Sequence, residues 1–357
     1  MTSEQTSILT GKALDLLKRL ITIPSFSKEE DKTADVIEAF LSANNIPAKR
    51  FQNNVWATNK YFDEQKPSLL LNSHHDTVKP NKAYTLDPFS PIEKEGKLFG
   101  LGSNDAGGSL VALLAVFLYF YEQQDLKYNL VFAATAEEEI SGKNGIEILL
   151  AELPKIECGI VGEPTLMQMA IAERGLLVLD VIATGKAGHA AREEGENALY
   201  KAIEDIEWFR NFEFEKISPL LGKVKMTVTV VDTENKAHNV VPSQCRFVVD
   251  VRVNELYTFE EIVQTIQSNV KSEVIPRSLR MRSTSIAMEH PLIKAGLTLD
   301  RAYYGSPTTS DKALMPFQTL KMGPGDSARS HTADEYIYTD EISKGIELYI
   351  QLLKQVL

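Results

Sequence analysis

Residues 69–76 read Leu-Leu-Leu-Asn-Ser-His-His-Asp, an apolar run that stops abruptly at two histidines and an acid. Such a run is typical of a strand covered on both faces, and these strands place functional residues at their C-terminal ends. His74 or His75 could bind a metal ion through a neutral imidazole nitrogen, with Asp76 orienting its neighbour. Taken alone, the triplet is more often an ordinary strand end with solvated histidines. Residues elsewhere in the chain must therefore decide between the two interpretations.

The length and charge of the chain narrow its class. A chain of 357 residues exceeds the usual size of one domain, so two domains are expected. A hydrophobic content of 43% supports a substantial core. Lys and Arg number 38 against 49 for Asp and Glu, a formal net charge of -11. This balance argues against a nucleic-acid or anionic-membrane partner and leaves small charged metabolites or peptides open.

The cysteines and the apolar stretches predict a cytoplasmic protein. Cys158 and Cys245 lie far apart and form no Cys-x-x-Cys zinc motif, so buried, reduced thiols are expected. The N-terminal residues 1–5 show no basic segment followed by an apolar one, as a secretory signal would. The longest apolar stretch, 110–121, is too short to cross a bilayer.

Acids follow apolar segments at three further places. Residues 98–108 read LFGLGSNDAGG, and glycines around one acid indicate close backbone approach to a site, or equally a structural turn before a helix. A Gly-Lys-Ser/Thr ending is absent, so a phosphate loop is excluded. The strand expected at 128–134 runs into Thr-Ala-Glu-Glu-Glu at 135–139, and residues 158–165 read CGIVGEPT. Repeated acids after apolar segments favour a site over chance.

The pattern of elements predicts an α/β protein with an insertion. Strands near 54–58 and 68–72 alternate with helices near 12–21, 28–41 and 109–121, which indicates a layered α/β domain. After residue 174 the texture changes to strand 176–184, helix 196–210, strands 223–231 and 244–253, helix 259–272 and strand 279–286. This β-α-β-β-α-β order predicts a compact two-layer inserted domain. We therefore expect one domain from 1–173 and 287–357, ending in a helix at 340–357, and an inserted domain at 174–286.

Two histidines and several carboxylates form the ligand set expected for a paired-metal hydrolytic site. In the order of these motifs along the sequence, the chain resembles the two-zinc amidohydrolases and metallopeptidases. This family includes acetylornithine deacetylase, succinyl-diaminopimelate desuccinylase, aminoacylase and carboxypeptidase G. The resemblance covers about residues 13–357. It implies a zinc-peptidase-like catalytic domain with a central mixed sheet, plus a ferredoxin-like lid and dimerisation domain.

The resemblance also implies a role for each matching residue. His74 and Glu163 match the ligands of the first metal, Asp105 the acid that bridges both metals, and Glu139 and His331 the ligands of the second. Asp76 matches the carboxylate that orients His74, and Glu138 the catalytic base. The metals are expected to be two divalent ions, Zn²⁺ first and Co²⁺ as the alternative. His75, Glu137, His238 and His290 receive no role and are expected to be partly exposed.

One departure from the family lies beside the bridging acid. The family commonly has a hydrophobic residue, Lys and two glycines after that acid, whereas this chain has Ala106, Gly107, Gly108 and Ser109. The position of the Lys is thus taken by Gly107, which suggests a reshaped pocket floor. The resemblance further implies a cis peptide after Asp105.

The inserted domain carries the family's lid motif. His189, in GKAGHAA at 185–191, matches a histidine that reaches the site of a partner subunit and stabilises the oxyanion. A homodimer is therefore expected, paired through an edge strand at 176–184 or 223–231. Asn239 and Arg252 match positions that contact substrate, although a lone Arg on a strand is otherwise more often salt-bridged.

Within the family, the lid sequence and the short length look most like acetylornithine deacetylases, enzymes of arginine biosynthesis. Deacetylation of N-acetyl-L-ornithine is the expected activity. The alternatives are desuccinylation of an N-succinyl ornithine, citrulline or diaminopimelate, and a dipeptidase or aminopeptidase. A non-catalytic binding module on the same fold is disfavoured, because such a chain should have lost at least one ligand or the base.

Overall fold

The computed structural model describes residues 2–357 of the chain. They form two units. The first unit comprises the chain up to Ile171 together with Ile286–Tyr304 and Ser310–Leu357, and the inserted unit comprises Ala172–Ser285 and Gly305–Thr309. The predicted junctions at 173/174 and 286/287 lie within a few residues of these bounds. Residues 305–309, expected in the catalytic domain, belong instead to the inserted unit.

The first unit is built on a mixed sheet with the strand order β1-β2-β6-β3-β7-β17-β8. Its strands are β1 Lys49–Phe51, β2 Asn54–Thr58, β3 Ser68–His74, β6 Asn129–Thr135, β7 Ile156–Val161, β8 Met169–Glu173 and β17 Gln318–Lys321. β3 is parallel to β6 and β7, whereas β2 and β6 are antiparallel. Every residue of β3 and β6 is buried, as their apolar runs predict. The loops that follow β3, β6 and β7 therefore meet at one edge of the sheet.

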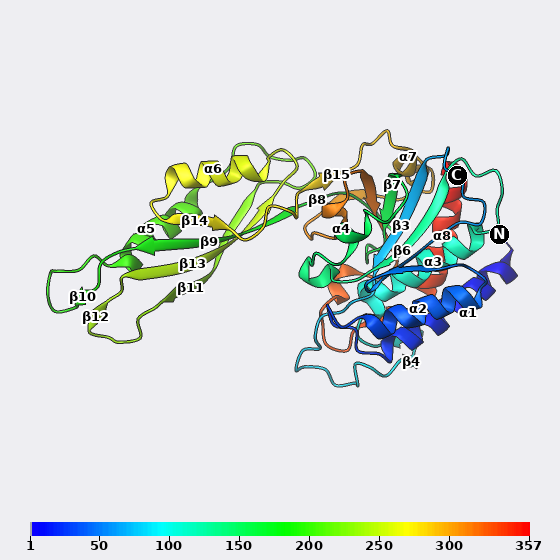
Figure 1. The fold of residues 1–357 in the computed structure, drawn as a ribbon, viewed down its shortest axis with the longest axis horizontal. Coiled ribbons are helices and arrows are strands. Elements are labelled where there is room, and N and C mark those ends of the chain that lie inside the picture. The colour runs from blue at the N-terminus through cyan, green and yellow to red at the C-terminus, as the bar shows by residue number, and fades with distance from the viewer. Residues whose placement is uncertain (1) are drawn as a thin grey trace. The chain divides into compact units, whose positions relative to one another are not determined.

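Helices cover the sheet. The longer helices are α1 Ser3–Ile21, α2 Asp31–Ala43, α3 Gly108–Phe120, α7 Pro291–Thr298 and α8 Thr339–Val356. α3 packs on β3 and β6 and contacts α1 and α8, and Figure 1 shows the three helices running together on one side of the sheet. Ser103–Phe120 is the one stretch among residues 2–357 that is long and apolar enough to cross a membrane, and 78% of it is buried inside the fold.

Short elements complete the first unit. They are β4 Ile92–Lys94, β5 Lys97–Phe99, β18 Tyr336–Tyr338, the short helix α4 Ile146–Leu149 and the helical turns η1 Ser103–Gly107, η2 Glu138–Ile140, η3 Asp311–Leu314 and η4 Ser327–Arg329. β16, Tyr303–Ser306, pairs with β8 and spans the boundary between the two units. β5 lies between β4 and β18 in a small antiparallel sheet. β5 leads into η1, and β18 follows η4. This small sheet therefore fixes the start of the loop that carries Asp105 and the end of the loop that carries His331.

The inserted unit has the predicted β-α-β-β-α-β order. It consists of β9 Gly175–Thr184, α5 Ala198–Asn211, β11 Lys225–Thr233, β13 Gln244–Val253, α6 Phe259–Asn269 and β14 Glu273–Pro276, with a separate two-stranded antiparallel sheet of β10 Gly188–His189 and β12 Val240–Val241. The sheet order is β11-β13-β9-β14. Burial alternates along β9, because one face packs on the helices.

Two expectations about the inserted sheet are wrong. The last strand is β14, and of the stretch 279–286 only β15, Thr284–Ser285, is a strand. β14 carries Val274 and Ile275, which suit a strand, whereas residues 277–282 read Arg-Ser-Leu-Arg-Met-Arg and form bends between β14 and β15. β9 pairs with both β13 and β14, so 176–184 is a central strand and cannot pair with a second subunit.

Candidate active site

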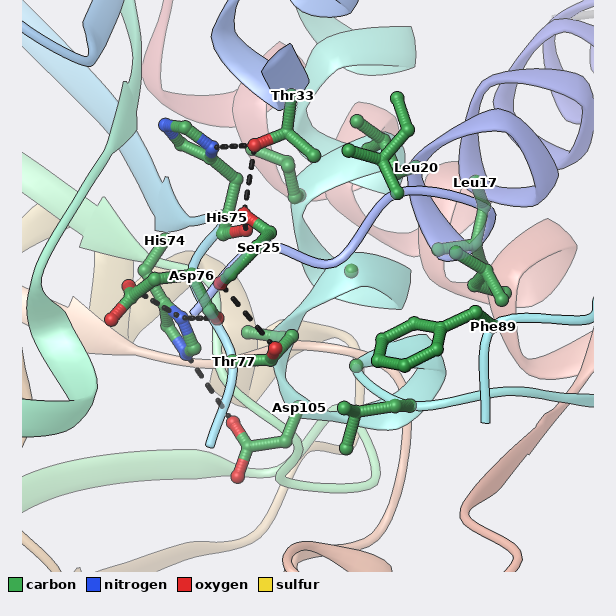
Figure 2. Close-up of a pocket in the computed structure, with 17 residues that line it drawn as sticks. Leu17, Leu20, Ser25, Thr33, His74, His75, Asp76, Thr77, Phe89 and Asp105 are labelled. Carbon is green, nitrogen blue, oxygen red and sulfur yellow. Dashed lines mark hydrogen bonds and ion pairs between the residues drawn. The ribbon is translucent and has the colours of Figure 1, made fainter. Parts of the chain in front are cut away.

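Three neighbouring strands deliver the polar residues of the site. β3 ends at His74, Glu138 and Glu139 follow β6 in η2, and Glu163 follows β7 by two residues. The imidazole Nε2 of His74 lies 3.3 Å from Asp105 Oδ1 and 4.0 Å from Glu138 Oε2. Figure 2 shows the His74 ring between Asp76 and Asp105. The sheet edge predicted to carry the site thus does gather these side chains.

Asp105 lies between the two predicted histidine ligands. Its second oxygen, Oδ2, is 3.6 Å from His331 Nε2, and the same nitrogen is 3.0 Å from Glu139 Oε2. Two sets of three residues could each hold a metal ion, because the potential ligand atoms within each set all lie within 4.8 Å of one another. The sets are His74, Glu138 and Glu163, and His74, Asp105 and Glu139. The position of Asp105 suits an acid shared by two metal ions.

The first of these sets includes Glu138, which the family resemblance assigns as the base. Its carboxylate lies within ligand distance of His74 and Glu163, so geometry alone admits Glu138 as a metal ligand as well. The two roles make different predictions for a Glu138→Gln variant, because loss of a base leaves the bound metal in place whereas loss of a ligand removes it.

The electrostatics of the site favour bound cations. Burial, opposed by Lys321, raises the pKa of Glu163 to about 8. Burial and the nearby charges of Glu163 and other acids raise the pKa of Glu138 well above its ordinary value. The hydrogen bond to Glu139 raises the pKa of His331 to about 9. Crowded acids beside two imidazoles form a donor set that fits divalent metal ions, and such ions would relieve the repulsion between the acids.

Asp76 does more than orient His74. The ring Nδ1 of His74 lies 3.0 Å from the backbone oxygen of Asp76 and 3.4 Å from its carboxylate. The same carboxylate accepts hydrogen bonds from the backbone N–H of Glu138 at 3.0 Å and of Glu139 at 3.1 Å, and from Ser27 Oγ at 2.7 Å. Asp76 therefore fixes the turn that carries the predicted base.

His75 is buried, which corrects the expectation of a partly exposed histidine. It is 6% exposed, with Nδ1 at 2.9 Å from Thr33 Oγ1 and Nε2 at 2.8 Å from the backbone oxygen of Asn53. Figure 2 shows its ring pointing to Thr33 and away from Asp105. Burial lowers the pKa of His75 to about 4, so the ring is neutral and acts as a structural bridge.

Glu137 is also buried, at 5% exposure, against expectation. Its carboxylate accepts hydrogen bonds from the side chain of Asn144 at 2.8 Å and from the backbone N–H of the same residue at 3.3 Å. Its own N–H donates to the buried Glu30 at 3.2 Å. His238 is exposed, and His290 is half-buried and caps α7 by accepting from Leu292 N–H.

The structure explains the glycine that replaces the family's Lys. The Asp105–Ala106 peptide is cis, as the resemblance implies. A Cβ atom at Gly107 would lie 2.4 Å from the carbonyl oxygen of Gly102 and 2.6 Å from Leu17 Cδ1. In this chain the turn therefore has no room for a side chain at position 107.

Three functional residues are predicted in the inserted unit: His189 and Asn239 lie close to each other, and Arg252 lies apart from both. His189 pairs with Val240 in the antiparallel sheet of β10 and β12, and Ala190 N–H donates to the backbone oxygen of Asn239 at 2.9 Å. The His189 side chain is exposed. Arg252 lies near the opposite end of β13 and binds Asp250 through two hydrogen bonds of 2.8 and 3.0 Å. Arg252 thus has the salt-bridged state expected of a lone strand arginine.

Sequence reasoning missed two buried polar residues close to the site. Lys321, 4% exposed, ends β17 and pairs with Val161, two residues before Glu163. Asp311, 4% exposed, accepts a hydrogen bond from Thr135 Oγ1 at 2.8 Å. For Lys321 a signal was present, since a single lysine interrupts the otherwise apolar segment Leu320–Met322.

The fold and the site define a metal-binding hydrolase, and comparisons with known proteins identify its family. The model of Peptidase family M20/M25/M40 matches residues 70–355, so the chain belongs to this family and is a hydrolase that acts on amide bonds. A succinyl-diaminopimelate desuccinylase of Rickettsia bellii is 24% identical over 380 residues, which cover 96% of both chains.

Solved structures show the same fold along the whole chain. An M20 family metallo-carboxypeptidase from Sulfolobus solfataricus has a TM-score of 0.77 at 16% identity and covers 97% of this chain and 99% of its own. A dinuclear metal-binding M20 peptidase from Bacillus subtilis has a TM-score of 0.71 at 14% identity and covers 98% and 99%. The predicted α/β fold class and family are therefore confirmed.

Proposed function

We propose that the chain removes an acyl group from the α-nitrogen of a small amino acid, with Glu138 as the general base. The observation that carries this proposal is the convergence of His74, Asp105, Glu138, Glu139, Glu163 and His331 at one sheet edge. Four carboxylates and two imidazoles exceed the needs of one ion and suit two.

Each residue then has a defined task. We propose His74 and Glu163 for one ion, Glu139 and His331 for the other, and Asp105 for both. When bound, the ions would supply Lewis-acid activation of water and of the amide carbonyl.

Glu138 is suited to moving the proton of the reaction. Burial raises its pKa well above the ordinary value, which favours a carboxyl group that takes a proton and gives it up again. In the proposed reaction Glu138 accepts the proton of the attacking water and passes it to the leaving α-amine. Asp76 keeps Glu138 in place through the bond to its N–H.

Two acyl groups are candidates. N-acetyl-L-ornithine is the substrate that the lid sequence and the length of the chain favour. An N-succinyl amino acid is the second candidate, supported by the name of the Rickettsia relative. A dipeptidase or aminopeptidase activity stays an alternative.

A panel of substrates separates these candidates. Release of the free amine is measured with acetyl-ornithine, succinyl-ornithine, succinyl-diaminopimelate and unblocked dipeptides at equal concentration. The proposal is supported if one Nα-acyl amino acid is hydrolysed at least about a hundredfold faster than any dipeptide. At about 1.4 kcal/mol of activation free energy for each tenfold in rate, this difference is about 2.8 kcal/mol. Preference for dipeptides overturns it.

We further propose a cytoplasmic homodimer in which the inserted unit supplies His189 to the partner's site, where it stabilises the oxyanion. Support comes from β11, an edge strand whose Val230 and Val231 are 51% and 48% exposed. Asn239, next to His189, and Arg252 are proposed substrate contacts, the latter only after exchange of its Asp250 partner. Sedimentation that finds a monomer would overturn the role of His189 in a partner's site.

A further inference from the structure

Glu335 is a buried acid outside the predicted ligand set. It follows His331 by four residues and is 2% exposed. Its Oε1 accepts hydrogen bonds from the backbone N–H of Asn104 at 2.8 Å and of Asp105 at 2.9 Å, and its Oε2 accepts from the N–H of Gly102 at 3.1 Å. One carboxylate therefore holds three amides of the loop that carries Asp105.

The backbone around Glu335 strengthens this attachment. Its carbonyl oxygen accepts from Gly100 N–H at 3.0 Å, and β18, which begins at the next residue, pairs with β5 just before the loop. Gly102 adopts φ +74, a left-handed conformation that directs its N–H into the carboxylate. A Cβ atom at Gly102 would lie 2.5 Å from Thr77, so the conformation and the space both require glycine.

The loop held by Glu335 and the loop that carries Glu335 meet again at the proposed metal site. His331 Nε2 lies 3.6 Å from Asp105 Oδ2, so a shift of either loop changes the distance between these two atoms. Bonds from amides to a carboxylate are short and strong, and partners of this kind set the orientation of metal ligands. Displacing Glu335 would release Asp105 and loosen the loop of His331 together.

We propose that Glu335 is a positioning residue that locks the Asp105 loop to the His331 loop, so that these two ligands are ordered or lost together. This inference rests on the metal-site part of the proposed function. It goes beyond that part by assigning the order of both loops to one residue that binds neither metal nor substrate.

The test compares Glu335→Gln with Asp334→Asn. In Glu335→Gln an amide NH₂ replaces one acceptor and faces an N–H donor, so at least one of the three bonds is lost. Asp334 is a matched control from the same loop as Glu335 and His331, because its carboxylate binds the backbone N–H of Thr85 and Leu86 rather than the amides of the Asp105 loop.

Zinc binding to the metal-free proteins is measured by calorimetry, and Co²⁺ binding by its absorption spectrum. Glu335→Gln is expected to weaken both binding events, by at least about tenfold for the ion proposed to use Asp105 and His331 together, and to alter the Co²⁺ spectrum, whereas Asp334→Asn stays near the wild type. A Glu335→Gln protein with lowered melting temperature but unchanged zinc affinity and Co²⁺ spectrum would reduce Glu335 to a structural residue and overturn the inference.

A second measurement covers a Glu335→Gln protein that does not fold. Hydrogen exchange of the wild type is followed during zinc titration, and peptides spanning 100–107 and 327–335 should gain protection at the same zinc concentration. Protection of only one of the two overturns the inference. Neither readout uses substrate, so a protein that binds zinc as described but hydrolyses no acyl amino acid contradicts the proposed function alone.

Discussion

Replacing Asp76 with Asn tests whether this carboxylate holds the turn of the catalytic base. Asp76 is 1% exposed and accepts two backbone N–H groups, those of Glu138 and Glu139, and one hydroxyl, that of Ser27. In Asp76→Asn one oxygen becomes an NH₂ group. Because the two N–H donors lie on different oxygens, one of them must lose its acceptor.

The size of the effect follows from these contacts. A hydrogen bond to a charged group contributes about 1.5–3 kcal/mol, and a buried donor left without a partner costs about 1–3 kcal/mol. We therefore expect Asp76→Asn to lower the free energy of unfolding by about 3 kcal/mol. Zinc affinity should fall by about 10–100-fold, because the turn that carries Glu139 is released.

Urea unfolding of the metal-free protein and zinc calorimetry measure the two quantities for Asp76→Asn. Ser27→Ala serves as the matched control, since it removes one hydroxyl from the same carboxylate and should cost about 1 kcal/mol with unchanged zinc affinity. If Asp76→Asn unfolds like the wild type and binds zinc as tightly, the carboxylate does not fix the turn.

Three further outcomes are expected. The hydrogen bond from Arg277 lowers the pKa of Asp180 from 3.8 to about 2, so its stabilisation is fully present above about pH 4 and is lost as pH falls through about 2. In urea unfolding, Asp180→Asn should cost about 1 kcal/mol at about pH 6 and much less at about pH 2. Burial raises the pKa of Cys158 to about 12, so iodoacetamide at about pH 8 should label it only after unfolding, as mass spectrometry would show. Gly107→Ala places a Cβ against the Gly102 carbonyl and should lower the free energy of unfolding by about 1–3 kcal/mol, and an unchanged value would contradict the packing described.

The elements of the fold could be predicted where an apolar run has clear ends. β3 and β6 are buried on both faces, so their composition alone marks them. β14 has only four residues, too few for a periodic pattern, and the pattern of the neighbouring stretch 279–286 predicts a strand there instead. Which strand lies at the sheet edge depends on pairing between distant segments, so β9 and β11 could not be told apart.

The predicted ligands could be found because each follows an apolar segment and matches a family motif. The residues that hold these ligands in position could not be found from the sequence. Asp76 binds N–H groups 62 and 63 residues away, and Glu335 binds amides 230 to 233 residues away. His75 looks like a ligand in sequence, and only the fold shows that it points to Thr33 and is buried. Supporting contacts of this kind form between segments that no local pattern connects.

The central claim is that Glu138 moves the proton of an amide hydrolysis without holding a metal, and one variant tests it most directly. Bound zinc and turnover of an acyl amino acid are measured on the same Glu138→Gln preparation. We predict the zinc content of the wild type and a rate lower by at least about a hundredfold, the scale of general-base catalysis. A near-normal rate would contradict the role of base, and a loss of zinc together with the rate would show Glu138 to be a ligand beside His74 and Glu163.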